Sequence, residues 1–142
     1  MAGLSKARKW FLHTALSYLG TPYIWGGDDP SGFDCSGFVI ECLKSCGLVG
    51  EYDDYSADGL FRKFAPQEIE TPEEAALLFY VGGGGKMVHV TICLDHQFQI
   101  GASGGASTIS NRQRAWQENA FVKIRPIRFK PTRMKVLRTF WE

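Results

Sequence analysis

The spacing of apolar residues changes at Ala75, and no other feature of this chain constrains its fold as strongly. Before this point, apolar residues recur at helical intervals over residues 4–19 and again over residues 35–45. Each segment is followed by a glycine, Gly20 or Gly47, of the kind that commonly ends a helix. The N-terminal half is therefore predicted to be helical.

The C-terminal half is strand-like instead. Residues 77–81 form an apolar run typical of a buried strand, and residues 86–94 and 98–102 predict a hairpin. Residues 120–138 alternate apolar and basic side chains, as expected for a strand with one solvated face. The sequence thus predicts an α+β fold in which N-terminal helices precede an antiparallel sheet.

Two segments connect or interrupt these elements. Residues 51–74 hold eight acidic and two basic residues, and we expect a surface excursion with a short helix near residues 57–64. Residues 101–105 are glycine-rich and are expected to form a loop. Neither this segment nor the glycine run at residues 82–85 is followed, at the needed spacing, by the Lys-Ser or Lys-Thr pair that a phosphate-binding loop requires.

The length of 142 residues predicts a single domain, residues 1–142. The net charge of +1 provides no overall field that would attract nucleic acid or a membrane surface. No apolar stretch is long enough to span a bilayer. The N-terminus resembles a signal peptide superficially, but its apolar run is short and contains His13, so we expect a helix. Synthesis in the cytoplasm without a visible signal peptide is therefore predicted.

Most cysteines and histidines of the chain are expected to have no chemical role. Cys42 and Cys46 lie one helical turn apart, a spacing that suits neither a disulfide within a helix nor a zinc site. With Cys93, they are expected to be small core residues. His13 and His96 are expected at the surface. We therefore assign no metal and no cofactor.

Cys35 and His89 are the exceptions. Cys35 begins a predicted helix, where unpaired backbone N–H groups and the helix dipole favour a thiolate, and His89 lies in strand-like sequence far downstream. A cysteine nucleophile and its base are commonly supplied in this way. Without its surroundings, Cys35 would be interpreted as a buried core thiol.

The residues around Cys35 form the most specific motif of the chain. Residues 21–27 read TPYIWGG and residues 30–39 read PSGFDCSGFV, which resembles the signature of the NlpC/P60 family of cell-wall cysteine peptidases. Residues 77–79 and 89–92 continue the resemblance, which covers about residues 8–105. It implies a papain-like fold in which helices carrying the cysteine pack on an antiparallel sheet carrying the histidine.

The resemblance also implies roles for single residues. Cys35 would be the nucleophile and His89 its general base, while Tyr23 would help to bind the reacting carbonyl. Asp34 and Ser36 match positions that contact the free amino end of a short muropeptide. The implied substrates are peptidoglycan stem peptides, often cut between D-glutamate and a diamino acid.

The residues themselves leave some of these roles open. Asp34 could instead cap the helix, and Ser36 could satisfy a backbone group of the first turn. Trp25 is interpreted as a wall of the site or as core packing. The backbone N–H of Cys35, at the helix start, is a ready donor for an oxyanion.

The chain departs from the family at the third catalytic position. Relatives place a polar residue there to orient the imidazole, but counting from His89 the position falls on Gly101. Strand alternation puts Gln99 and Ser103 on the same face. We therefore predict a Cys35–His89 dyad assisted weakly by Gln99. Gln99 could instead be a simple polar strand residue, with a backbone carbonyl or water orienting the ring.

Two other functions remain open. The chain could be a weak or inactive relative that binds cell-wall peptide or a protein partner. It could also be a structural component of a virion or secretion apparatus, and delivery by a phage or a secretion system to the cell wall would suit it.

Basic residues of the C-terminal segment also allow two interpretations. They either form a solvated face or provide a patch for anionic wall polymers. The residues concerned are Lys123, Arg125, Arg128, Lys130, Arg133, Lys135 and Arg138.

Overall fold

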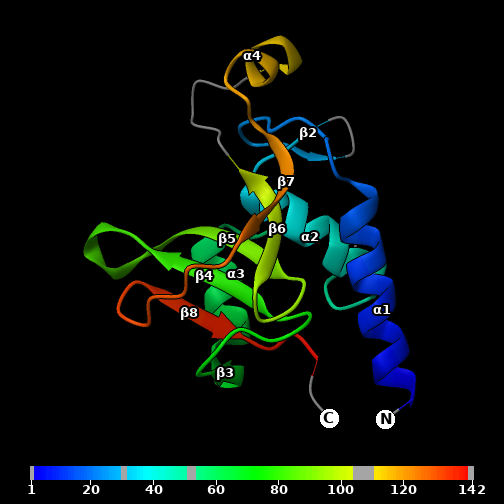
Figure 1. The fold of residues 1–142 in the computed structure, drawn as a ribbon, viewed down its shortest axis with the longest axis vertical. Coiled ribbons are helices and arrows are strands. Elements are labelled where there is room, and N and C mark those ends of the chain that lie inside the picture. The colour runs from blue at the N-terminus through cyan, green and yellow to red at the C-terminus, as the bar shows by residue number, and fades with distance from the viewer. Residues whose placement is uncertain (1, 30–31, 51–53, 104–110, 141–142) are drawn as a thin grey trace.

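The fold combines helices at the N-terminus with one large antiparallel sheet, as the sequence predicts (Figure 1). The computed structural model describes residues 2–29, 32–50, 54–103 and 111–140. Its helical half consists of α1 (Ala2–Ser17), the short hairpin of β1 (Asp28–Asp29) and β2 (Gly32–Phe33), α2 (Cys35–Ser45), α3 (Ala57–Phe64) and the 3-10 turn η1 (Ala65–Gln67).

The large sheet has the strand order β3-β8-β4-β5-β6-β7, and each neighbouring pair is antiparallel. Its strands are β3 (Glu68–Ile69), β4 (Leu77–Val81), β5 (Met87–Cys93), β6 (Phe98–Ser103), β7 (Phe121–Pro126) and β8 (Met134–Leu137). The 3-10 turn η2 (Gly83–Gly85) connects β4 to β5, and α4 (Arg112–Gln117) lies between β6 and β7.

Local signals explain where the helices begin and end. The carboxylate of Asp34 accepts a hydrogen bond from the backbone N–H of Gly37 at 2.7 Å and so caps α2. Ser56 caps α3 in the same manner. Gly20 and Gly47 have φ angles of +86° and +72°, the left-handed conformation in which helices commonly terminate.

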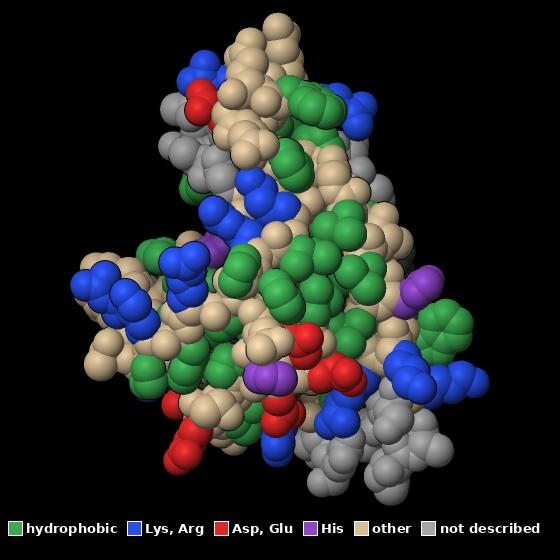
Figure 2. Space-filling view, in the orientation of Figure 1, with side chains coloured by type: hydrophobic (Ala, Val, Ile, Leu, Met, Phe, Trp, Pro, Cys, Tyr) green, Lys and Arg blue, Asp and Glu red, His purple; other side chains and the backbone are tan. Residues whose placement is uncertain are grey.

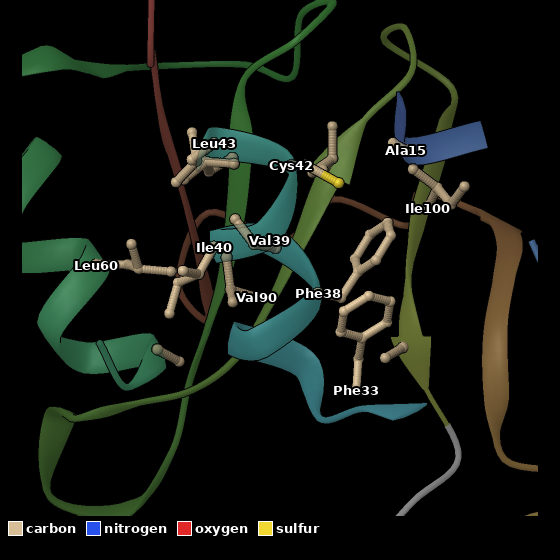
Figure 3. Packing of buried hydrophobic residues seen from close by; sticks show 14 of the residues in the cluster. Ala15, Phe33, Phe38, Val39, Ile40, Cys42, Leu43, Leu60, Val90 and Ile100 are labelled. Atoms are coloured by element: carbon tan, nitrogen blue, oxygen red, sulfur yellow. The ribbon is translucent and has the colours of Figure 1, made fainter. Parts of the chain in front are cut away.

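Helix α2 lies at the centre of the main core. Figure 3 shows Phe33, Phe38 and Ile100 on one side of this helix, and Leu43, Ile40 and Leu60 on the other. All six side chains are almost fully buried. The first residue of α2 is therefore held firmly against the sheet, because the helix is packed on both sides.

The opposite face of the sheet has a smaller core. It is formed by Ala76, Leu78, Cys93, Met134 and Val136, with partly buried Tyr80 and Phe129 beside it. Cys42 and Cys93 are buried free thiols, as predicted, while Cys46 is only partly buried. His13 and His96 are exposed, also as predicted.

Four sequence predictions are wrong in part. Residues 120–138, predicted as a strand, form two strands, β7 and β8, which lie at different places in the sheet. Residues 101–103 belong to β6 rather than to a loop, and the rest of that predicted loop lies outside the described residues. Residues 51–74 were expected to lie at the surface, but part of this segment belongs to the core, because Leu60 of α3 is fully buried. In α1 the predicted apolar face, which includes Trp10 and Phe11, is buried only in part: Phe11 is buried whereas Trp10 is 58% exposed.

Helix α4 was not predicted, since its six residues show little apolar periodicity. Among the described residues, no helix is both long and apolar enough to cross a membrane.

Candidate active site

A cleft of about 640 Å³ lies where the start of α2 meets β5, β6 and β7. Its other walls come from the loop before β1 and from the residues that lead into α3. Six of the seven site residues predicted from the sequence line it, namely Tyr23, Trp25, Asp34, Cys35, Ser36 and His89. Gln99 lines a neighbouring cavity instead.

Cys35 is the first residue of α2 and is partly exposed. The backbone N–H groups of Val90, Ser36 and Cys35 itself face its sulfur and act to lower its pKa. Because Val90 follows His89 in β5, the thiol lies against the strand that carries the histidine.

The cleft favours the neutral form of this thiol. Burial is the largest cause and raises the pKa of Cys35, and the Asp34 carboxylate raises it further. The hydrogen bond from the Val90 N–H acts in the opposite direction but is the smaller effect. The thiolate expected from the helix terminus is therefore not favoured in the free cleft, since the helix end is desolvated and lies beside an acid.

His89 is partly buried on β5. Burial, followed by the charge of Arg125, lowers its pKa from 6.5 to about 4. The imidazole is thus neutral near pH 7, the form that a general base requires. Its ring lies beside that of Tyr80, its cross-strand neighbour on β4, with centroids 5.2 Å apart. None of the described residues hydrogen-bonds to the imidazole.

Tyr23 and Trp25 come from the loop before β1. Tyr23 is buried, and desolvation, with the nearby Cys35 and Asp34, raises its pKa to about 12. Its hydroxyl therefore keeps its proton and can donate a hydrogen bond. Trp25 is 57% exposed and lines the cleft, so it is a wall of the site and not a core residue.

Asp34 and Ser36 are joined in the first turn of α2. The Ser36 hydroxyl donates to Asp34 Oδ1 at 3.3 Å, the oxygen that also caps the helix. The turn is packed tightly, because a Cβ atom at Gly37 would collide with the carbonyl oxygen of Gly27. Both residues also border the cleft, which leaves contact with a ligand compatible with capping.

Gln99 forms no hydrogen bond to the imidazole in the described part of the chain. Its Oε1 accepts hydrogen bonds from the hydroxyls of Tyr80 at 2.5 Å and Thr91 at 2.7 Å, and its Nε2 donates to the carbonyl oxygen of Pro126 at 3.1 Å. The oxygen predicted to accept from His89 is therefore already used. Among the described residues, Gln99 is linked to the histidine through Tyr80, whose hydroxyl it accepts from and whose ring lies beside the imidazole.

Sequence reasoning missed Tyr80. The available signal was its place in the strand that forms a hairpin with the strand of His89, but only the register shows that the two residues are opposite each other. The lack of space for a side chain at Gly101 also depends on tertiary contacts, because a Cβ atom there would lie 2.6 Å from Thr91 Cγ2. Thr91 thus occupies the space that a side chain at the usual third position would need.

A second cavity of about 410 Å³ adjoins the cleft on the far side of His89. His89, Ser103 and Arg125 line both cavities, whereas Arg128 lines only the second. Arg125 was predicted only as part of a basic segment, and its contact with the site depends on the pairing of β7 with β6. Within the described part of the chain, no group of three or more metal-ligating side chains is found.

Comparison with known proteins agrees with this arrangement. Residues 20–125 match the sequence model of the NlpC/P60 family. The chain belongs to the NlpC/P60 family. The match includes Cys35, His89 and every other residue that was predicted to form the site.

Several relatives of this NlpC/P60 chain have names that describe an activity. Peptidoglycan endopeptidase RipB of Mycobacterium tuberculosis is 33% identical over 125 residues, which cover 77% of this chain and 48% of RipB. Dipeptidyl-peptidase 6 of Lysinibacillus sphaericus is 33% identical over 101 residues, or 70% of this chain and 34% of the relative. Gamma-D-glutamyl-L-lysine dipeptidyl-peptidase of Bacillus subtilis is 35% identical over 94 residues. The chain thus spans about half or less of the length of these relatives.

Solved structures show the same fold. The structure of the peptidoglycan hydrolase RipB from Mycobacterium tuberculosis superimposes with a TM-score of 0.73 at 24% identity, covering all of this chain and 69% of the other. An NlpC/P60 family protein from Bacillus cereus gives a TM-score of 0.72 at 22% identity, covering 93% of this chain. The papain-like NlpC/P60 fold predicted from the sequence is therefore confirmed.

Proposed function

We propose that this NlpC/P60 chain is a cysteine endopeptidase that hydrolyses peptidoglycan stem peptides at the cell wall. The observation that supports it most strongly is the placement of Cys35 and His89 in one cleft, with the thiol against the backbone of Val90, the next residue after the histidine. The names of relatives that act on peptidoglycan add support from similarity.

The ionisation of the two groups suggests how the reaction starts. A neutral thiol faces a neutral imidazole, so His89 accepts the proton of Cys35 as the sulfur attacks the peptide carbonyl. The imidazolium then gives this proton to the leaving amine, and the carbonyl carbon stays bound to sulfur as a thioester. Water, deprotonated by His89, hydrolyses the thioester and restores the thiol.

Donors for the oxyanion are available beside the thiol. The backbone N–H groups of Cys35 and Ser36 point to the region of the sulfur. The Tyr23 hydroxyl is protonated and buried next to Cys35. We propose that these donors stabilise the negative oxygen that forms when the carbonyl is attacked.

Gln99 has an indirect role in this proposal. It holds the hydroxyl of Tyr80, whose ring lies beside the imidazole, and so limits rotation of His89. This arrangement would take the place of a third catalytic side chain at Gly101. It makes Gln99 a positioning residue for a Cys35–His89 dyad.

The peptide bond that is cleaved is proposed from similarity to a relative. One relative is named for the bond between γ-D-glutamate and L-lysine. We propose the corresponding bond, between D-glutamate and a diamino acid, as the one cleaved here. Asp34 and Ser36 would bind the free amino end of the peptide.

A binding role without catalysis is the second candidate. It is favoured by the missing side chain at Gly101 and by the raised pKa of Cys35. Such a protein would bind wall peptide without turnover.

Digestion of purified peptidoglycan separates the two candidates. The parent protein is expected to release peptides whose new ends, identified by mass spectrometry, are D-glutamate and a diamino acid. Cys35→Ala should release none while keeping its circular dichroism spectrum, because only a sulfur atom is lost. Cys42→Ala is the matched control and should remain active, since Cys42 is buried away from the cleft. Retained activity in Cys35→Ala, or no release by the parent, would contradict catalysis by Cys35.

A further inference from the structure

The two cavities that meet at His89 differ in charge. On the Cys35 side, the cleft is lined by the carboxylates of Asp34 and Asp54. The second cavity is lined by Arg125, which also borders the cleft, and by Arg128, and no acidic side chain among the described residues lines it. A ligand that spans both cavities would thus meet acids at one end and arginines at the other.

The basic residues of the C-terminal segment differ in whether they have partners. Lys135 pairs with Glu68, Arg138 pairs with Glu73, and Lys123 donates to the backbone of Asn119. Four others are exposed and form no ion pair with any described residue, namely Arg125, Arg128, Lys130 and Arg133, and of these four Arg125 and Arg128 are the two that line the second cavity. Their guanidinium groups are therefore available to a ligand.

Arg125 is also fixed close to the reacting groups. Its strand, β7, pairs with β6 so that Arg125 lies opposite Gln99. The buried Gln99 side chain donates to the carbonyl oxygen of Pro126, which holds the end of β7 at the cavity. The charge of Arg125 is felt at both His89 and Tyr80. Figure 2 shows Lys and Arg side chains gathered at the edge of a hollow in this part of the surface.

The direction of the reaction decides which part of the peptide reaches these arginines. His89 must pass its proton to the leaving amine, so the leaving portion lies on the His89 side of the cleft. Beyond His89 the next groups are Arg125 and Arg128. A carboxylate on the leaving portion would meet a planar guanidinium, which can bind it with two parallel hydrogen bonds.

We propose that Arg125 and Arg128 form a subsite that binds a carboxylate on the leaving portion of the peptide. The inference rests on the proposed peptidase function, since it uses His89 to orient the ligand. It makes the carboxyl group on the leaving side a determinant of specificity. Peptides that lack this carboxylate are bound more weakly.

Binding to an inactive variant tests the subsite without turnover. The probes are L-alanyl-γ-D-glutamyl-L-lysine with a free C-terminal carboxylate and the same peptide with a C-terminal carboxamide. Titration calorimetry on Cys35→Ala is expected to show about tenfold tighter binding of the carboxylate form, as for a hydrogen bond to a charged group. Added salt should reduce this difference.

Substitution of single arginines shows which of them causes the preference for the carboxylate probe. Arg125→Gln in the Cys35→Ala background should abolish most of the preference, and Arg128→Gln should weaken it. Arg133→Gln is the matched control, because Arg133 is exposed but lines neither cavity, and it should keep the preference.

Each remaining outcome has a definite meaning. Equal affinity for the two probes, or a preference that survives Arg125→Gln, would overturn the subsite and leave the peptidase proposal intact. Failure of Cys35→Ala to bind either probe would overturn the subsite together with the proposed substrate. If the parent protein does not digest peptidoglycan but the carboxylate probe is still preferred, the peptidase proposal alone would be overturned.

Discussion

At the scale of single residues, a buried polar network behind His89 determines how firmly its imidazole is held. Gln99 accepts hydrogen bonds from both Tyr80 and Thr91, and it donates to Pro126. Of the two hydroxyl donors, Tyr80 is the one whose ring lies beside the histidine ring, with centroids 5.2 Å apart. This difference allows positioning of His89 to be separated from general stability.

We predict that Tyr80→Phe and Gln99→Ala each lower kcat about fivefold with little change in KM, the loss expected for one hydrogen bond of about 1 kcal/mol. The double variant should be no slower than the slower single variant, because both changes remove the same link. Steady-state kinetics over a range of pH measures these effects.

Thr91→Val is the control for this network. It removes the second donor to Gln99 with little change of shape and leaves the hydrogen bond from Tyr80 to Gln99 in place. Its kcat should stay within about twofold of the parent even if its stability falls by the roughly 1 kcal/mol of a lost hydrogen bond. An equal loss of kcat in Thr91→Val would mean that the network only supports the fold.

At the scale of elements, α2 presents Cys35 because its first turn is capped by a residue that also borders the cleft. Asp34 accepts the N–H of Gly37 and the hydroxyl of Ser36. Asparagine preserves a capping oxygen but removes the charge, whereas alanine removes both. Substitution therefore separates the two roles of Asp34.

We expect Asp34→Ala to lower the free energy of unfolding by about 1 kcal/mol and Asp34→Asn by only a few tenths. If Asp34 also binds the amino end of the peptide, both variants should raise KM. Urea unfolding and steady-state kinetics on the same preparations distinguish the effects. A normal KM in Asp34→Asn would leave capping as the role of Asp34.

At the scale of the whole molecule, burial of His89 lowers the free energy of unfolding in acid. Burial holds the pKa of His89 at about 4 in the folded protein, below its ordinary value of 6.5. Between these two values the unfolded chain binds a proton that the folded protein does not. Stability is therefore fully retained above pH 6.5 and falls as the pH drops toward 4.

We predict that the parent loses up to about 3 kcal/mol of stability from this group between pH 6.5 and pH 4. His89→Gln removes the titrating group, so its stability should depend less on pH in this range. Chemical unfolding at several pH values measures the slope. His13→Gln, at an exposed position of α1, is the control and should follow the parent curve; equal slopes in parent and His89→Gln would contradict the prediction.

The sequence by itself determined the elements that local signals specify. Helical spacing, the capping position of Asp34 and the stops at Gly20 and Gly47 are all encoded within a few residues, and α2 has the predicted bounds. The motif around Cys35 and the later position of His89 predicted the family and the fold. No long-range contact is needed for any of these inferences.

Only the tertiary structure decided the ionisation and the surroundings of the site. Burial of Cys35 outweighs the helix terminus, and cross-strand pairing brings Tyr80 beside His89 and gives Gln99 other partners. Pairing of β6 with β7 brings Arg125 to the cavity. Desolvation and side-chain contacts depend on residues that are distant along the chain, so spacing and motifs could not predict them.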